Sequence, residues 1–136
     1  MSNIKVVRQY LKDLSFEVPN APQIFSKPAE KPQINISIDI DVKKLGEDVY
    51  EVALKVNADA DQKELFVCEV EYAGIFNIEN IEEDMLEQIL LVYCPNILFP
   101  FIRSIITNST VNGGFSPLML DPVDFADLYR KRKQAN

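Results

Sequence analysis

Residues 93–101 read Tyr93-Cys94-Pro95-Asn96-Ile97-Leu98-Phe99-Pro100-Phe101, and they join two patterns typical of helices. Proline disfavours the helical conformation of the residue before it, so the upstream helix is predicted to stop at Cys94. Asn96 is a residue type that accepts hydrogen bonds from the free N–H groups at the start of a helix, so a second helix is predicted to follow. The stretch therefore predicts a corner at which two helices meet at an angle.

Apolar residues recur every three to four positions on both sides of this corner, which is the spacing of one helix face. Upstream, the helix is predicted to begin at Asn80, with Glu83 completing a capping box. Downstream, the second helix is predicted to stop at Asn112-Gly113-Gly114. A last helix is predicted to start at Asp121-Pro122, and residues 130–136 form a short basic tail. The apolar faces contain Met85, Leu86, Ile89, Leu90 and Tyr93, then Leu98, Phe101, Ile102, Ile105 and Ile106, and finally Phe125, Leu128 and Tyr129.

Four segments before these helices alternate between apolar and polar residues, as strands with one covered face do. The clearest runs from Ile34 to Val42, with isoleucine or valine at every second position. Residues 4–18, 50–58 and 65–72 alternate similarly, and the proline-containing segment 20–31 is predicted to be a long ordered loop. Strands followed by helices predict an α+β domain: a four-stranded antiparallel sheet with the helices packed on one face. A single domain is expected over residues 1–136, with its core at about 6–129.

The composition of the chain limits the classes of function that it can have. The 136 residues include 21 acidic and 14 basic side chains, a net charge of −7, which disfavours nucleic acid and anionic membranes and favours a basic partner. There is no histidine, and Cys68 and Cys94 are expected to be small buried hydrophobes, so a metal site is not predicted. No apolar run reaches the roughly 18 residues needed to span a bilayer, and no signal-peptide core is present near Met1, so the protein is expected to stay in the cytoplasm.

Catalysis is not predicted, because the chain has neither a phosphate-binding glycine motif nor a nucleophile paired with a base. Carboxylates such as Glu69 and Glu71 share a strand face, and such pairs are ordinarily solvated. The aromatic residues are more informative: they either fill the core or line a groove that binds extended apolar segments of varied sequence. The Leu65 and Val67 side of the last strand is only partly polar, and it is either ordinary surface or an interface with a second subunit.

Five separate motifs in the same order resemble the SecB family of bacterial protein-export chaperones. They are Asp48 to Val52, Phe66 to Val70, Ala73 to Phe76, Tyr93 to Phe101 and Pro122 to Phe125, within a resemblance that runs from about Val6 to Tyr129. The resemblance implies a cytosolic, ATP-independent holding chaperone, without enzymatic activity or cofactor, that binds unfolded precursor proteins in apolar grooves and passes them to the motor SecA. It also implies a homotetramer, built as a dimer of dimers.

The resemblance also implies roles for particular residues. The client-binding groove would contain Phe25, Phe66, Phe76, Phe101 and Phe125. The SecA-binding surface would contain Asp13, Glu17, Val67 and Glu69, and contacts within the tetramer would involve Cys68, Val70 and Tyr72. The three acidic residues of the SecA-binding set occupy the polar phase of their strands, so they are predicted to form a patch on the sheet face away from the helices.

Two features depart from the family pattern. The loop at residues 27–32 lacks a tryptophan that many members carry, so one subsite of the groove is expected to differ in detail from the family pattern. The basic tail at residues 130–136 is short, so the C-terminal contact with SecA that the family makes through a longer tail is expected to be weakened or absent. Two other functions stay open: a SecB-like chaperone dedicated to one partner, such as an antitoxin, and a small acidic adaptor without holding activity.

Overall fold

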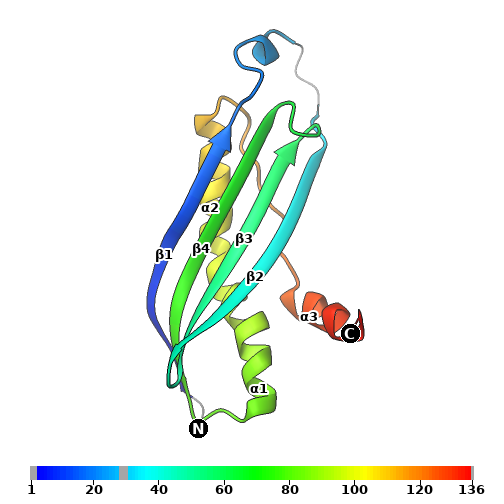
Figure 1. The fold of residues 1–136 in the computed structure, drawn as a ribbon. Coiled ribbons are helices and arrows are strands. Elements are labelled where there is room, and N and C mark those ends of the chain that lie inside the picture. Colours follow the sequence, from blue (N-terminus) through cyan, green and yellow to red (C-terminus); the bar gives the residue numbers. More distant parts are fainter. Residues whose placement is uncertain (1–2, 28–30, 136) are drawn as a thin grey trace.

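The computed structural model describes residues 3–27 and 31–135, so part of the predicted loop at residues 20–31 lies outside the described residues. Four long strands form one antiparallel sheet in the order β1-β4-β3-β2 (Figure 1). They are β1 (Asn3–Glu17), β2 (Ile34–Gly46), β3 (Val49–Ala60) and β4 (Phe66–Glu79), and the short 3-10 helix η1 (Gln23–Ser26) lies between β1 and β2. The predicted α+β class and the four-stranded antiparallel sheet are confirmed.

A long helix covers one face of the sheet and is built from three consecutive parts. These are α1 (Glu83–Gln88), the π-helical segment η2 (Ile89–Tyr93) and α2 (Cys94–Asn112), which together run as one 30-residue helix. Its length and composition would suffice to cross a membrane. However, α2 contacts β4 and β3, and its residues Leu98, Ile102 and Ile106 are fully buried in the shared core. We therefore interpret it as a core helix. A separate helix, α3 (Phe125–Ala135), packs beside η2.

The predicted break at Cys94 is wrong, because the chain stays helical through Pro95. Cys94 has φ −64° and ψ −46°, which are helical values. The π-helical turns of η2 lie directly upstream of Pro95, and they change the hydrogen-bond spacing where proline, which lacks an N–H group, cannot complete the regular ladder. Cys94, Pro95 and Leu98 are all buried. Their burial outweighs the local preference for ending the helix.

The predicted capping box at the start of the long helix is also wrong. Asn80 has a positive φ of 58°, so it lies in a left-handed turn before the helix. Glu82 occupies the N-cap position and makes no side-chain capping hydrogen bond. Asparagine tolerates left-handed conformations, and here the turn out of β4 uses this property.

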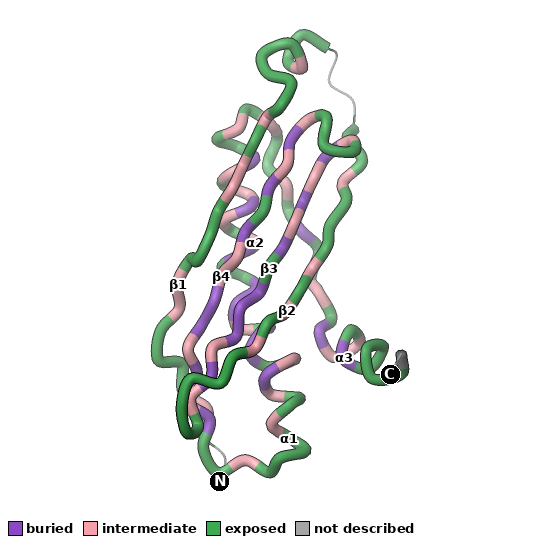
Figure 2. Tube along the Cα trace, viewed as in Figure 1, coloured by how far each residue is buried: buried purple, intermediate pink, exposed green. Residues whose placement is uncertain are grey.

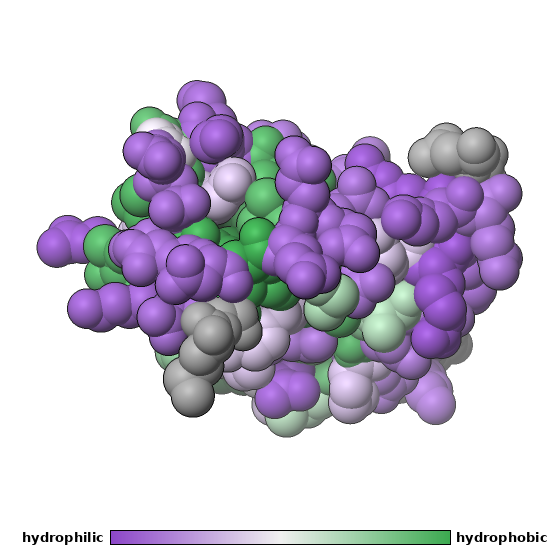
Figure 3. All heavy atoms as spheres, turned by 90° about the horizontal axis from the view of Figure 1, so that it is seen from below, coloured by the Kyte–Doolittle hydropathy of each residue, from purple (hydrophilic) through white to green (hydrophobic). Residues whose placement is uncertain are grey.

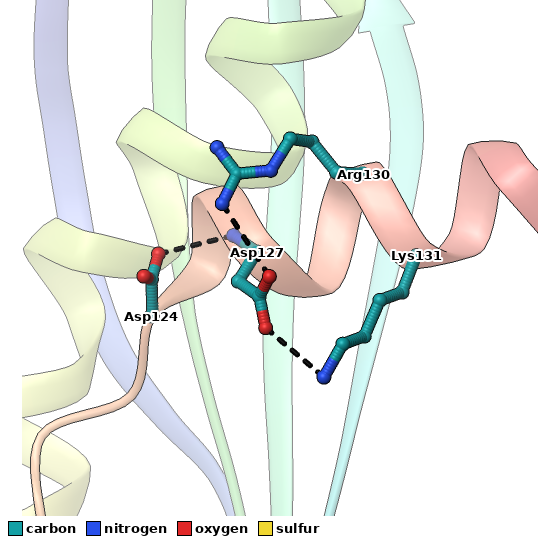
Figure 4. Close-up of polar contacts among 4 residues, drawn as sticks. All are labelled: Asp124, Asp127, Arg130 and Lys131. Atoms are coloured by element: carbon teal, nitrogen blue, oxygen red, sulfur yellow. Dashed lines mark hydrogen bonds and ion pairs between the residues drawn. The ribbon is translucent and has the colours of Figure 1, made fainter.

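The last helix, α3, begins later than the predicted Asp121-Pro122 start. The carboxylate of Asp124 accepts a hydrogen bond of 3.0 Å from the backbone N–H of Asp127, which satisfies a free donor at the helix start (Figure 4). The Asp127 carboxylate in turn lies 3.4 Å from Arg130 Nη2 and 3.1 Å from Lys131 Nζ. The first turns of α3 therefore have their own local network of polar contacts.

Burial is concentrated in the two central strands, β3 and β4 (Figure 2). The edge strands β1 and β2 contain only half-buried and exposed residues. The apolar residues of β2 alternate as predicted, but the strand lies at the edge of the sheet, and Ile36 is 41% exposed. Both edges of the sheet therefore keep apolar side chains within reach of solvent.

Candidate functional site

Four phenylalanine rings gather where β1, β4, η1 and the end of α2 meet, and we call them the aromatic cluster (Phe16, Phe25, Phe66 and Phe115). The ring centroids of Phe16 and Phe66 are 5.4 Å apart. Those of Phe66 and Phe115 are 5.2 Å apart, and those of Phe115 and Phe25 are 5.4 Å apart. These are separations of packed aromatic rings. The cluster therefore forms a continuous row from the sheet to the loop that contains η1.

Two glycines after α2 make room for this row. A Cβ atom on Gly113 would overlap the ring of Phe16, and one on Gly114 would lie 3.1 Å from the ring of Phe25. Gly114 also has a φ of 93°, which glycine adopts without strain. The Gly-Gly pair that ends the helix therefore also seats two rings of the aromatic cluster.

The aromatic cluster is buried at its sheet end and exposed to solvent at its loop end. Phe66 is 3% exposed, whereas Phe25 is 49% exposed. None of the residues of η1 is buried, and a hydrogen bond of 3.0 Å from Asn20 Nδ2 to the carbonyl oxygen of Glu64 connects this loop to the turn before β4. Phe25 thus packs on the aromatic cluster through Phe115 and leaves the rest of its ring open to solvent.

The predicted groove residues do not line a single groove. Phe25 and Phe66 belong to the aromatic cluster. Phe101 lies elsewhere, on α2, where it is 47% exposed and stacks on Tyr72 with ring centroids 5.8 Å apart. Of these three predicted residues, Phe25 and Phe101 present a large part of their surface to solvent.

Phe76 and Phe125 lie in the core, although the resemblance implied a place in the groove. They are 0% and 1% exposed, and the ring of Phe125 packs on Phe99 with centroids 6.0 Å apart. Their rings fill the interior, so neither is available to a bound chain in this structure. The sequence reasoning missed Phe16 and Phe115. Phe16 could have been found from its place in the apolar phase of its strand. Phe115 could have been found from its position directly after the two glycines that end the helix.

Two adjoining hollows open beside β2, and sequence reasoning missed both. The first has a volume of about 630 Å³ and lies between β2 and α1, and the second has a volume of about 280 Å³ and lies between β2, η2 and α3. Apolar surface is visible between hydrophilic side chains at this end of the molecule (Figure 3). The first is lined by Val42, Glu83, Asp84, Leu86, Glu87, Leu90 and Leu91, and the second by Ile38, Asp39, Ile40, Leu91, Leu128, Tyr129 and Arg132.

Glu87 connects α3 to α1. The hydroxyl of Tyr129 donates a hydrogen bond of 2.8 Å to Glu87 Oε1, and Lys133 Nζ lies 3.6 Å from the same oxygen. The Lys133 ammonium also lies 5.3 Å from the centre of the Tyr129 ring. The hydrogen bond from Tyr129, assisted by nearby cations, lowers the pKa of Glu87. These contacts hold the wall of the second hollow in place.

The sheet face away from α2, which we call the outer face, carries the predicted acidic residues. Asp13 of β1 lies opposite Glu71 of β4, and Glu17 lies opposite Val67. Glu69 lies between these two positions on β4, and alternate residues of β4 face α2, so all of these side chains share the outer face. Asp13, Glu17 and Glu69 are exposed. The structure thus brings the three predicted carboxylates together, with Val67 beside them.

A separate polar group on the outer face connects β1 to β3. The hydroxyl of Tyr10 donates a hydrogen bond to Glu51, and Lys12 Nζ lies 3.1 Å from the same carboxylate. Burial and this hydrogen bond raise the pKa of Tyr10 to about 12, while the hydrogen bond from Tyr10 lowers the pKa of Glu51. Glu51 is therefore paired within the chain, whereas the ion pairs found among the described residues do not include Asp13, Glu17 or Glu69.

Cys68 and Val70, which the resemblance assigned to tetramer contacts, face α2. They are 0% and 1% exposed within a single chain, so their side chains are not available for direct contact with another subunit. Burial raises the pKa of Cys68 to about 11 and that of Cys94 to about 12. Tyr72, the third residue of this set, is only half-buried.

The chain thus combines a long helix on an open antiparallel sheet with an aromatic cluster, two hollows beside β2 and an acidic outer face. Within residues 3–27 and 31–135, no three Cys, Asp or Glu side chains come together as a metal site requires. The family model described as preprotein translocase subunit SecB matches residues 1–136, and the chain belongs to the SecB family.

Relatives named Protein-export protein SecB confirm the resemblance seen in the sequence. The chain is 47% identical over 133 residues to the protein of Parvibaculum lavamentivorans, covering 96% of this chain and 79% of that one. It is 48% identical over 128 residues to the protein of Afipia carboxidovorans, covering 93% and 80%. The Mycobacterium tuberculosis SecB-like chaperone, solved in complex with a ChAD peptide from the HigA1 antitoxin, has a TM-score of 0.70 at 16% identity, covering 88% of this chain and 87% of that one. This likeness confirms the fold.

Proposed function

We propose that this protein is a cytoplasmic, ATP-independent holding chaperone that binds unfolded precursor proteins and delivers them to the SecA motor. Membership of a protein-export chaperone family supports the general role. The observation that carries the proposal is the aromatic cluster, which ends in the half-exposed ring of Phe25. The free energy gained by burying apolar surface does not depend on the orientation of the groups that are buried. Such a site therefore accepts extended segments of varied sequence.

The proposed activity is binding, so it requires no nucleotide, cofactor or metal. The chain contains no Walker-type glycine motif and only 4 glycines. Held clients stay unfolded as long as their apolar segments are covered, and transfer of the client follows when SecA binds the loaded complex on its separate surface.

Aggregation of several unrelated unfolded proteins, followed by light scattering without ATP, tests the proposal. We expect suppression of aggregation for most of these clients at stoichiometric chaperone. Protection of a single partner only would instead indicate a dedicated chaperone of the kind that binds an antitoxin, and protection of none would indicate an acidic adaptor. The names of the relatives at 47% and 48% identity favour export over the dedicated role.

The outer-face carboxylates Asp13, Glu17 and Glu69, with Val67, are the proposed SecA-binding surface. A patch of exposed carboxylates attracts a basic segment, and each exposed pair contributes only about 0.2–1 kcal/mol, so several must act together. This surface lies opposite the face covered by α2, so SecA and a client would not compete for the same residues. Loss of SecA binding with retained client binding is the expected signature of damage here.

A homotetramer is the proposed assembly, with Tyr72 near its contacts. Exposed apolar residues on β1 and on the long helix support it, because contact with another subunit would bury this surface. They include Val6, Val7, Leu11, Leu14, Met85, Tyr93, Phe101 and Val111. Four chains of 15.5 kDa would give a particle of about 62 kDa. Light scattering measures this mass directly, and a monodisperse monomer at micromolar concentration would contradict the assembly.

A further inference from the structure

Strand β1 contains an extra residue, Lys12, directly beside the acidic residues of the outer face. Tyr10 lies opposite Ala73 of β4 and Asp13 lies opposite Glu71, whereas Lys12 has no partner on β4, which is the arrangement of a β-bulge. The extra residue shifts the alternation of β1 by one position. Tyr10 and Asp13 therefore share the outer face although they are three positions apart.

The ammonium group of Lys12 is held by Glu51 of β3. Lys12 Nζ lies 3.1 Å from Glu51 Oε1, and the hydroxyl of Tyr10 donates a hydrogen bond to the other carboxylate oxygen. Tyr10, Ala73 and Ala53 form one row across β1, β4 and β3. The two alanines are 0% and 2% exposed, and their small side chains leave room for Tyr10 to reach Glu51. The Glu51 side chain is only 12% exposed, so this ion pair is better shielded than an ordinary surface pair.

Other carboxylates of the outer face lie close to the same lysine. Asp13 follows Lys12 in the chain, and Glu71 lies opposite Asp13. The hydrogen bond to Glu51 raises the pKa of Lys12, and the charge of Glu71 adds to this effect, so Glu71 lies within electrostatic range of the ammonium group. The ion pairs found in the described part of the chain include neither Asp13 nor Glu71. Lys12 is thus bound to one carboxylate beside others that stay unpaired.

Resting on the proposed SecA-binding surface, we propose that Glu51 is a positioning residue that holds the Lys12 ammonium away from the neighbouring carboxylates and keeps them free for a basic segment of SecA. Glu51 acts through Lys12, because its own side chain is largely covered. Once released, Lys12 would pair with Asp13 or Glu71. A tethered cation of this kind competes at high effective concentration with the basic residues of a partner.

Isothermal titration with SecA at low salt, where exposed charges are least screened, tests the proposal. Glu51→Gln keeps the shape of the side chain, releases Lys12 and should weaken SecA binding by up to about 5-fold, the effect of one exposed ion pair. This variant also removes a negative charge, so a second substitution must separate the two causes. Glu51→Gln/Lys12→Met should restore the wild-type affinity, because no released lysine remains.

Lys43 provides the charge-matched control. It lies opposite Glu51 on β2, on the side away from β1, so it is not a neighbour of Asp13. Glu51→Gln/Lys43→Met has the same net charge as the other double variant, yet Lys12 is still released in it. Its SecA affinity should therefore stay below that of Glu51→Gln/Lys12→Met. Circular dichroism and the amide resonances of β1 verify that each variant is folded with the strand register unchanged.

The role of Glu51 is overturned if Glu51→Gln binds SecA as tightly as the wild type. Equal recovery in both double variants overturns it too, because net charge alone would then explain the loss, and so does the absence of recovery when Lys12 is replaced. In each of these cases the proposed SecA-binding surface stands, since the wild-type protein binds SecA. If the wild-type protein holds unfolded clients but does not bind SecA, the proposed delivery to SecA fails and the role of Glu51 with it.

Discussion

Replacement of Phe25 by alanine should weaken client binding while leaving the fold intact. Phe25 is 49% exposed, so about half of a side chain that presents roughly 200 Å² is free to contact a client. At about 25 cal/mol per Å², this half is worth up to about 2.5 kcal/mol, or an affinity loss of up to about 70-fold. No residue of η1 is buried, so the contact of Phe25 with Phe115 orders a local segment. The free energy of global unfolding should change by less than about 1 kcal/mol.

Fluorescence anisotropy with a labelled unfolded client measures the affinity, and urea unfolding followed by circular dichroism measures the stability. Phe125→Ala is the contrasting variant: Phe125 is 1% exposed, so its truncation should cost about 3–5 kcal/mol of stability and impair binding through unfolding. Phe101→Ala removes a similarly exposed ring outside the aromatic cluster, among the proposed subunit contacts; compared at equal oligomeric state by light scattering, it tests whether any surface aromatic has the same effect. A folded Phe25→Ala protein that holds clients as tightly as the wild type would refute the assignment of the aromatic cluster.

Three further predictions concern other parts of the molecule. Glu69→Lys should weaken SecA binding in isothermal titration, most at low salt, while client holding is unchanged; equal loss of both would contradict the division of faces. Cys68 and Cys94 should resist thiol reagents in the native protein and react after unfolding, because burial raises their pKa values to about 11 and 12, and fast native labelling would count against this. Tyr129→Phe should raise the pKa of Glu87 toward 4.5 in an NMR titration. Because the folded pKa of Glu87 is depressed, its contribution to stability is present above the unfolded pKa and lost as pH falls through the folded pKa, so the stability difference between this variant and the wild type should vanish in strong acid.

Local sequence patterns were sufficient to predict the strands, the class of fold and the family. The alternation of apolar and polar residues in Ile34–Val42 and in the other three strands depends only on side chains two positions apart. It can therefore be recognised in a short stretch of sequence, and the four predicted strands were confirmed. The same alternation placed Asp13, Glu17 and Glu69 on one face, because antiparallel pairing brings equal phases together. The five ordered motifs were sufficient for the SecB family, since they identify the chain without reference to any contact.

Long-range packing determines that the helix continues through Pro95 and which aromatic rings are exposed. Pro95 favours a break locally, but burial of Cys94 and Leu98 against the sheet keeps the helix continuous. Phe25 and Phe125 are equally apolar in sequence, yet one is 49% and the other 1% exposed. The aromatic cluster and the first hollow beside β2 each combine residues from segments far apart in the chain. Burial and convergence of this kind depend on long-range packing, which no local pattern of residues specifies.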